Sequence, residues 1–329
     1  MSYALEDTSK TNGNASQHTL GLKWPALLQT KTEPAWDGRN VLEISGLIKG
    51  YGFRKKTLKG VTLTVPTGAI YGLLGRNGSG KTTLIHTFLG LYRKDSGSVA
   101  IFGRSPYKDG PAILARIGYV PETISVFDWI NVGGLIQFLR GIYKDWDNGY
   151  CYELLKRFEL PLDIKIRDLS KGMKTKVSVV AALSHRPEFL VLDDPTLGLD
   201  QVVLREVFET LQEISRREGS TIFIASHAIE QVEKIATHIG LFSDGKIMVS
   251  DTLAGLKMRT REVRLTFPDD VPEIKNIAHF KTLRQSGRHL TGVVLDTSSG
   301  AIEKLKQLGA DEIEVRELDL SEIFFNFMK

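Results

Sequence analysis

Residues 72–83, GLLGRNGSGKTT, decide the fold. The run from Gly75 to Thr82 matches the pattern G-x-x-x-x-G-K-[ST], in which glycines permit a turn whose backbone N–H groups point at phosphate oxygens. An apolar segment precedes this run and a segment with helical spacing follows it, which is the context that the pattern requires. The stretch therefore predicts a phosphate-binding loop between a strand and a helix.

The polar side chains of this loop suit a nucleoside triphosphate. Lys81 can reach the β and γ phosphates, and the hydroxyl of Thr82 can bind Mg²⁺. A helix that starts near Gly80 adds the positive end of its dipole. The alternative, a plain glycine-rich turn, explains neither the lysine nor the flanking segments. The expected contacts to the nucleotide are Gly75, Asn77, Gly78, Ser79, Gly80, Lys81, Thr82 and Thr83.

A second stretch, FLVLDDPTLGLD at residues 189–200, places two carboxylates at the end of a short apolar strand. Adjacent like charges at such a position need a cation in front of them. We expect this strand to lie beside the phosphate loop, with Asp193 facing the Mg²⁺ and Asp194 facing the water that attacks the γ-phosphate.

Composition limits the classes of function. The 329 residues are 42% hydrophobic and 25% charged with a net charge of +4, and the sequence has no basic block that marks a nucleic-acid surface. The single cysteine, Cys151, excludes an intrachain disulfide and a thiolate metal cluster. The sequence has no membrane-spanning apolar run and no secretory signal, so we expect a cytoplasmic protein.

Changes in composition and in periodicity divide the chain into three parts. Residues 1–40 are polar and aperiodic, and we interpret them as a disordered extension. Residues 41–250 alternate strands and helices in the manner of a parallel α/β sheet, with a helical segment at about 122–184. Residues 257–329 predict a small α+β domain, including a helix at 272–277, without a catalytic cluster.

The end of the chain predicts a helix with one apolar face. We expect this helix to pack within its own domain or against a second copy, and less readily on a membrane. The face consists of Leu320, Ile323, Phe324, Phe327 and Met328.

The order of the motifs resembles that of the nucleotide-binding subunits of ABC transporters, over about residues 41–250. Glu122 in GYVPE lies 122 − 81 = 41 residues after the loop lysine, where the family has a glutamine. LSKGM at 169–173 stands in the place of the LSGGQ signature, and GLD at 198–200 resembles the D-loop. His227 in IASHAIE stands in the place of the switch histidine, and Tyr51 resembles the aromatic residue that stacks on adenine.

This resemblance implies a P-loop NTPase core of the ABC ATPase type, with an antiparallel β subdomain, a helical subdomain and a small C-terminal α+β domain. Two such domains would pack head to tail around two ATP molecules, with Ser170 and Gly172 of one copy over the γ-phosphate held by the other. The implied catalytic residues are Asp194, His227, Glu122 and Lys81, and the implied metal ligands are Thr82, Asp193 and Glu122. Taken singly, Tyr51 could be an exposed turn residue, Ser170 a helix cap and His227 a capping histidine.

Three positions depart from the family pattern. Asp194 replaces the usual glutamate, which withdraws the carboxylate by roughly 1 Å, and a misplacement of that size can cost on the order of 100-fold in rate. Glu122 replaces glutamine, and Lys171 and Met173 replace glycine and glutamine of the signature. LSKGM, with FLRGIYKDWD upstream, is similar to the ABC-2-type exporter ATPases, including the antibiotic-export and YtrB-like group.

The resemblance predicts an ATP-hydrolysing subunit that drives export by a separate membrane permease. The permease would contact the helical subdomain, and the chain would lie on the cytoplasmic face of the membrane. The predicted ligands are ATP and Mg²⁺, and the predicted protein partners are a second ATPase subunit and the permease, without nucleic acid. Two alternatives stay open: a catalytically weak or regulatory subunit of a heterodimer, and a non-transport ABC ATPase.

Overall fold

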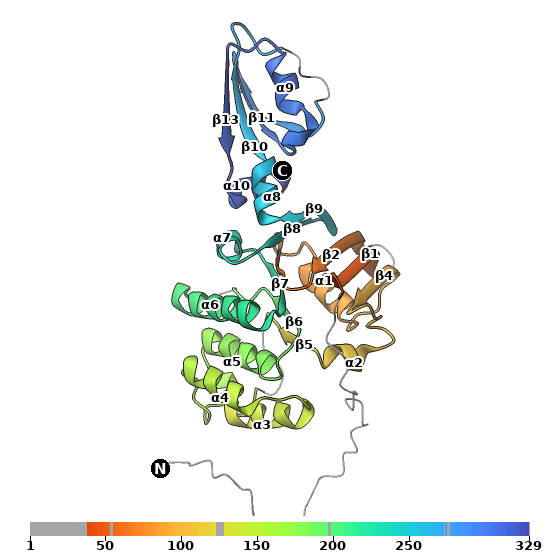
Figure 1. Ribbon diagram of the computed structural model, residues 1–329, viewed down its shortest axis with the longest axis vertical. Helices are drawn as coiled ribbons and strands as arrows, with labels where there is room; N and C mark the ends of the chain where they lie inside the picture. Colours follow the sequence, from red (N-terminus) through yellow and green to blue (C-terminus); the bar gives the residue numbers. More distant parts are fainter. Residues whose placement is uncertain are drawn as a thin grey trace, which may run out of the picture.

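The computed structural model describes residues 38–52, 55–122, 128–196, 199–272, 274 and 277–328. Figure 1 shows the chain as an α/β body with a smaller α+β unit at one end. The predicted extension, except its last residues, and Gly198 of the D-loop motif lie outside the described residues.

A six-stranded sheet forms the centre of the α/β body, with the order β5-β6-β7-β3-β8-β9. All its pairs are parallel except β8 with β9. The sheet corrects one expectation, because β7 lies between the strand of the two carboxylates, β6, and the strand before the phosphate loop, β3. The strands are β3 (Ile70–Leu74), β5 (Ile117–Val120), β6 (Phe189–Asp193), β7 (Thr221–Ser226), β8 (His238–Ser243) and β9 (Lys246–Thr252).

One face of this sheet packs on α1 (Lys81–Phe88) and on a three-stranded antiparallel sheet in the order β2-β1-β4. Along β6, alternate side chains such as Phe189 and Val191 join this core, while Leu190 and Leu192 join the opposite one. The three strands are β1 (Asn40–Tyr51), β2 (Lys55–Pro66) and β4 (Ser96–Ile101). The predicted antiparallel β sheet beside the parallel core is therefore confirmed.

The opposite face carries the helices that follow β5. The predicted helical segment contains α3 (Val132–Ile142), α4 (Asn148–Arg157) and α5 (Lys171–Leu183), and α5 contacts β5. After β6 come α6 (Gln201–Glu218) and α7 (Ile229–Glu233), and the shorter α2 (Gly110–Leu114) precedes β5. None of the helices in the described part of the chain is both long enough and apolar enough to cross a membrane.

After α8 (Leu253–Arg259), the chain forms a four-stranded antiparallel sheet in the order β11-β12-β10-β13. Its strands are β10 (Arg261–Thr266), β11 (Phe280–Ser286), β12 (His289–Val294) and β13 (Glu312–Glu317), with helices α9 (Ala301–Lys306) and α10 (Leu320–Met328). The sequence patterns did not indicate β8, β9 or β11. The helix expected at 272–277 is wrong for its described residues, which are not helical.

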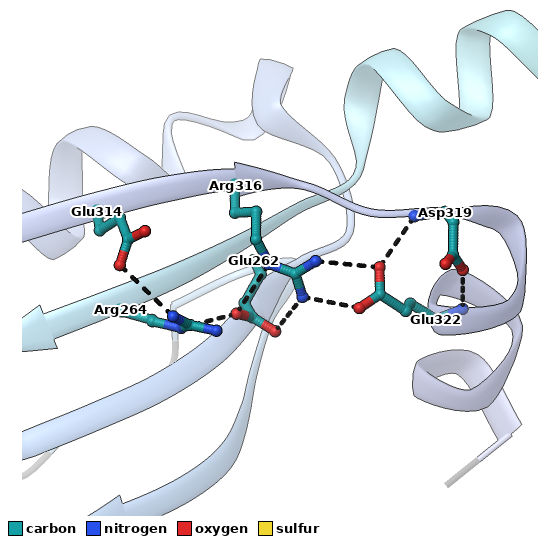
Figure 2. Close-up of polar contacts among 6 residues, drawn as sticks. All are labelled: Glu262, Arg264, Glu314, Arg316, Asp319 and Glu322. Carbon is teal, nitrogen blue, oxygen red and sulfur yellow. Dashed lines mark hydrogen bonds and ion pairs between the residues drawn. The ribbon is translucent and has the colours of Figure 1, made fainter.

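The C-terminal helix α10 lies between its own sheet and the α/β body. Its predicted apolar face buries Leu320, Ile323 and Phe324 in the main hydrophobic core, and the helix contacts α7 and β8. The expectation that it packs within its own domain is therefore incomplete. Figure 2 shows how Arg316 of β13 donates to the carboxylates of both Glu262 and Glu322, which fixes the start of α10 to the sheet.

Candidate functional site

The phosphate loop has the left-handed backbone that its glycines permit. Gly78 and Gly80 have φ values of 75° and 107°, and α1 begins directly after Gly80. Gly75 is needed for a different reason, because a Cβ at this position would lie 2.7 Å from the carbonyl oxygen of Phe242. The Gly75 N–H also donates to the Ser226 carbonyl at 3.3 Å, which joins the loop to the end of β7.

Lys81 is buried at the first position of α1. Its Nζ donates to the carbonyls of Gly75 at 2.9 Å and Arg76 at 3.3 Å, so the amine lies across the loop. Burial lowers the pKa of Lys81, and the nearby Asp194, Asp193 and Glu122 carboxylates oppose this shift. The lysine is thus a cation held inside the loop, where it can contact a phosphate in place of these carbonyls.

A cleft of about 380 Å³ brings the predicted residues together, and Thr57 joins them in its wall. An adjoining cleft of about 930 Å³ shares Tyr51, Thr57 and Gly78 with it and also contains Ser79. Volumes of this size suit a nucleotide. The predicted residues in the wall of the first cleft are Tyr51, Asn77, Gly78, Gly80, Lys81, Thr82, Thr83, Glu122, Asp193 and Asp194.

Asp193 is 1% exposed and faces the loop from the end of β6. Its pKa is raised to about 6, first by burial and then by the Glu122 and Asp194 carboxylates, while a hydrogen bond with Thr82 and the charge of Lys81 act against the shift. Its Oδ1 and the Oγ of Ser79 are buried without a hydrogen-bond partner among the described residues. A cation beside Asp193 would relieve its desolvation cost.

These oxygens fit Mg²⁺, which prefers hard oxygen ligands and keeps waters and substrate phosphates in its shell. In the described part of the chain, no group of three or more His, Cys, Asp or Glu residues is arranged to hold a metal ion by itself. The donor set therefore suits a metal that arrives with a nucleotide rather than one held by protein ligands alone.

Asp194 forms the polar contacts expected of an oriented base. Its Oδ2 lies 2.7 Å from Nδ1 of His227, and its Oδ1 accepts from the hydroxyls of Thr196 at 3.0 Å and Ser226 at 3.4 Å. Its backbone has a positive φ of 45°, a conformation that aspartate tolerates better than most residues with a side chain. The predicted Asp194 and His227 are thus brought into direct contact from the ends of β6 and β7.

Ser170 and Gly172 are not brought to this cleft. Ser170 is exposed and caps α5, with its Oγ accepting from the Met173 N–H at 3.2 Å, and neither residue lines the loop of its own chain. Gly172 lies close to α6, because a Cβ there would lie 3.3 Å from a methyl group of Val203. The helix-cap interpretation of Ser170 is correct in the single chain, in which Ser170 and Lys171 of the signature are exposed.

Two side chains that hold the predicted Asp194, and one in the wall of the clefts, were not predicted from the sequence. Thr196 and Ser226 fix the Asp194 carboxylate, and their positions, two residues after Asp194 and directly before His227, were the available signal. Thr57 lies in the wall of both clefts. It belongs to none of the sequence motifs, so the sequence offered no signal for it.

Known proteins with similar sequences also bind ATP, as the geometry of the phosphate loop predicts for this chain. Residues 58–197 match the family model described as ABC transporter. The ATP-binding protein YtrB of Bacillus subtilis (strain 168) is 31% identical over 269 residues, which cover 82% of this chain and 92% of YtrB. The bacitracin transport ATP-binding protein BcrA of Bacillus licheniformis is 33% identical over 224 residues, covering 68% of this chain and 73% of BcrA.

The solved structure of an ATP-binding subunit of an ABC transporter has the same fold, with a TM-score of 0.61 and 26% identity, and covers 66% of this chain and 92% of its own. The sequence matches and the geometry of the loop, the two aspartates and the histidine agree. The chain belongs to the ABC transporter family, as an ATP-binding subunit similar to YtrB and BcrA.

Proposed function

We propose that the chain drives export as one half of a head-to-tail ATPase dimer. The observation that carries this is the separation of the two halves of the site: the phosphate loop faces a cleft, whereas Ser170 is exposed and neither it nor Gly172 lines that cleft. A second subunit can supply the signature to that cleft. The Ser170 hydroxyl, which can still donate its proton, and the N-terminus of α5 would then meet the γ-phosphate.

We assign the chemistry to the residues of the cleft. Asp193, Thr82 and Glu122 would hold Mg²⁺, which neutralises developing charge on the phosphates. Lys81 would bind the β and γ phosphates. Asp194, held by His227, would accept a proton from the attacking water.

Export requires a membrane partner, which we place at the helical segment. The loops before α3 and before α5 lie side by side, since Val132 N–H donates to Ile164 and Ile166 N–H donates to Ile130. A solvent-exposed apolar group in and beside these loops suits a cytoplasmic helix of a permease. This group consists of Trp129, Phe138, Ile142, Leu162 and Ile164. Binding there would hold the chain on the cytoplasmic face of the membrane.

Two measurements on the purified full chain test this function. Lys81→Ala should abolish Mg²⁺-dependent ATP binding, and Asp194→Asn should keep binding while lowering turnover by at least about 100-fold. The tagged chain should also co-purify in mild detergent with a polytopic membrane protein, and Trp129→Glu should release that protein without lowering ATP binding. Turnover that is unchanged by Asp194→Asn would reject its assignment as the base.

A further inference from the structure

Tyr51, the residue expected to stack on adenine, lies at the exposed end of a strand. Tyr51 is the last residue of β1, and its side chain is 50% exposed. Its hydroxyl lies 3.4 Å from the hydroxyl of Thr83 on α1. A ring at a strand end can stack on a purine with full effect only when its orientation is fixed before binding, because ordering it on binding costs free energy.

The segment between α1 and β4 holds the backbone next to this ring. Asp95 accepts the Gly50 N–H at 2.8 Å, and its own N–H donates to the Ile48 carbonyl at 2.9 Å. Its other carboxylate oxygen lies 3.8 Å from the Nζ of Lys49, which in turn lies 5.5 Å from the centroid of the Tyr51 ring. Asp95 therefore fixes the last three residues before Tyr51.

The same segment also holds the ring itself. The Tyr92 ring meets the Tyr51 ring edge to face, with centroids 6.1 Å apart and planes at 87°. On its other side Tyr92 packs against His86 of α1, with centroids 4.9 Å apart, and His86 Nε2 lies 2.9 Å from the hydroxyl of Tyr119 on β5. Tyr92 is thus supported by two elements of the rigid core.

We propose that Tyr92 and Asp95 are positioning residues that hold the Tyr51 ring ready for the adenine base. The inference rests on the proposed ATP-binding function and on the adenine-stacking role that the resemblance to the ABC family implies for Tyr51. On this proposal, the nucleotide site has two parts. The phosphates bind to the loop and α1, whereas the base depends on a ring that the 92–95 segment orients.

This separation predicts a difference between two ligands. ATP contacts both parts, whereas inorganic tripolyphosphate has no base and contacts only the phosphate part. An edge-to-face ring pair is worth up to about tenfold in affinity when it orients a binding group. Loss of Tyr92 should therefore weaken ATP alone, while a general distortion of α1 would weaken both ligands.

The experiment measures equilibrium binding of Mg²⁺–ATP and Mg²⁺–tripolyphosphate to the full chain. Tyr92→Leu should weaken ATP by about 3- to 10-fold and tripolyphosphate by less than about twofold. Tyr92→Phe, which keeps the ring edge, should retain ATP affinity, and Asp95→Ala should resemble Tyr92→Leu. Tyr152→Leu, which removes an exposed aromatic from α4, is the matched control.

Tyr51→Ala separates the inference from the function beneath it. In the Tyr51→Ala background, Tyr92→Leu should cause no further loss of ATP affinity, because Tyr92 acts through that ring. Equal weakening of ATP and tripolyphosphate by Tyr92→Leu overturns the inference, and so does unchanged ATP affinity when Tyr51→Ala alone is harmful. Unchanged ATP affinity in Tyr51→Ala rejects the stacking role itself, and the inference with it.

Discussion

At the scale of single residues, the site keeps charge where burial disfavours it. Asp193 is almost fully buried, and its pKa is raised to about 6 by burial and by neighbouring carboxylates. Since this pKa lies above that of an unfolded aspartate, the ionised carboxylate destabilises the nucleotide-free fold above about pH 6. The penalty decreases as the pH falls towards 4, because the folded state takes up the proton first. Stability is given up here for the carboxylate that we propose as a Mg²⁺ ligand.

Asp193→Asn should therefore stabilise the nucleotide-free chain while removing Mg²⁺-dependent hydrolysis. We expect a gain of about 1–2 kcal/mol at pH 7.5, or a rise in Tm of roughly 2–6 °C. Thermal unfolding in EDTA measures it, and the gain should shrink at pH 5. Asp168→Asn, at an exposed aspartate, is the control and should shift Tm little. A lower Tm for Asp193→Asn at pH 7.5 would contradict this account.

At the scale of elements, α10 depends for its position on a cluster of charged side chains around the buried Glu262. Glu262 on β10 is 8% exposed and accepts from Arg316 and Arg264, and Arg316 also donates to Glu322 at the start of α10, as Figure 2 shows. Asp319 and Glu322 form a reciprocal cap, each carboxylate accepting the other residue's N–H. Arg316 thus joins β10 and β13 to α10, which in turn contacts α7.

Arg316→Met should loosen α10, because it leaves Glu322 without this partner and Glu262 with only Arg264. We expect a loss of about 1–2 kcal/mol in the free energy of unfolding, measured by urea denaturation. Arg264→Met is the matched control, since its side chain is more exposed and it leaves the Arg316 contacts intact, so it should cost less than about 1 kcal/mol. Equal losses for the two variants would show that Arg316 has no special role.

A second element-scale feature is the joint between the helical segment and the central sheet. His185, two residues after the end of α5, is buried. Its Nε2 lies 3.1 Å from the Ile117 carbonyl on β5, and its ring stacks on Tyr143 with centroids 4.0 Å apart. Burial lowers the pKa of His185 to about 4. The neutral imidazole therefore helps to join α5 to β5.

The joint should weaken in acid. Because the pKa of His185 in the fold is below that of an unfolded histidine, its contribution is complete above about pH 6.5 and is lost as the pH falls towards 4. We expect His185 to account for a loss of roughly 2 kcal/mol between pH 7 and 5. Urea denaturation at both pH values should show a smaller loss in His185→Gln, and an equal loss in both proteins would contradict the assignment.

At the scale of the whole molecule, one chain presents a half-site and the part that would complete another. The phosphate loop, Asp193, Asp194 and His227 meet at the carboxyl edge of the central sheet, whereas the cap of α5 is exposed on the helical segment. Figure 1 shows α5 among the helices at the end of the α/β body opposite the C-terminal unit. Such a layout favours assembly around ATP.

Ser170→Arg should prevent that assembly without weakening ATP binding to the single chain. The larger, charged side chain would occupy the space of the partner's γ-phosphate contact. Light scattering in Mg²⁺–ATP, in an Asp194→Asn background that slows turnover, should show dimers for the parent and monomers for the variant. Ser286→Arg, at an exposed position of β11, is the control. Dimers formed by Ser170→Arg would contradict the head-to-tail arrangement.

The sequence by itself determined the phosphate loop and the parallel α/β core, whereas the antiparallel sheet was expected only from the resemblance to the ABC family. Glycine spacing, a lysine–threonine pair and continuous apolar runs are local signals that do not depend on the rest of the chain. The strands β8, β9 and β11 were missed for two reasons. Gly240 interrupts the apolar run of β8, and β9 and β11 contain no fully buried residue, so none of the three gives a clear period.

Only the tertiary structure decided which groups meet. It placed β7 between β6 and β3, brought Thr196 and Ser226 to Asp194, and set Tyr92 against Tyr51. It also put α10 between two parts of the chain. A pattern along the sequence reports which face of an element is apolar, but its partner depends on strand order and packing between distant segments, which no local period encodes.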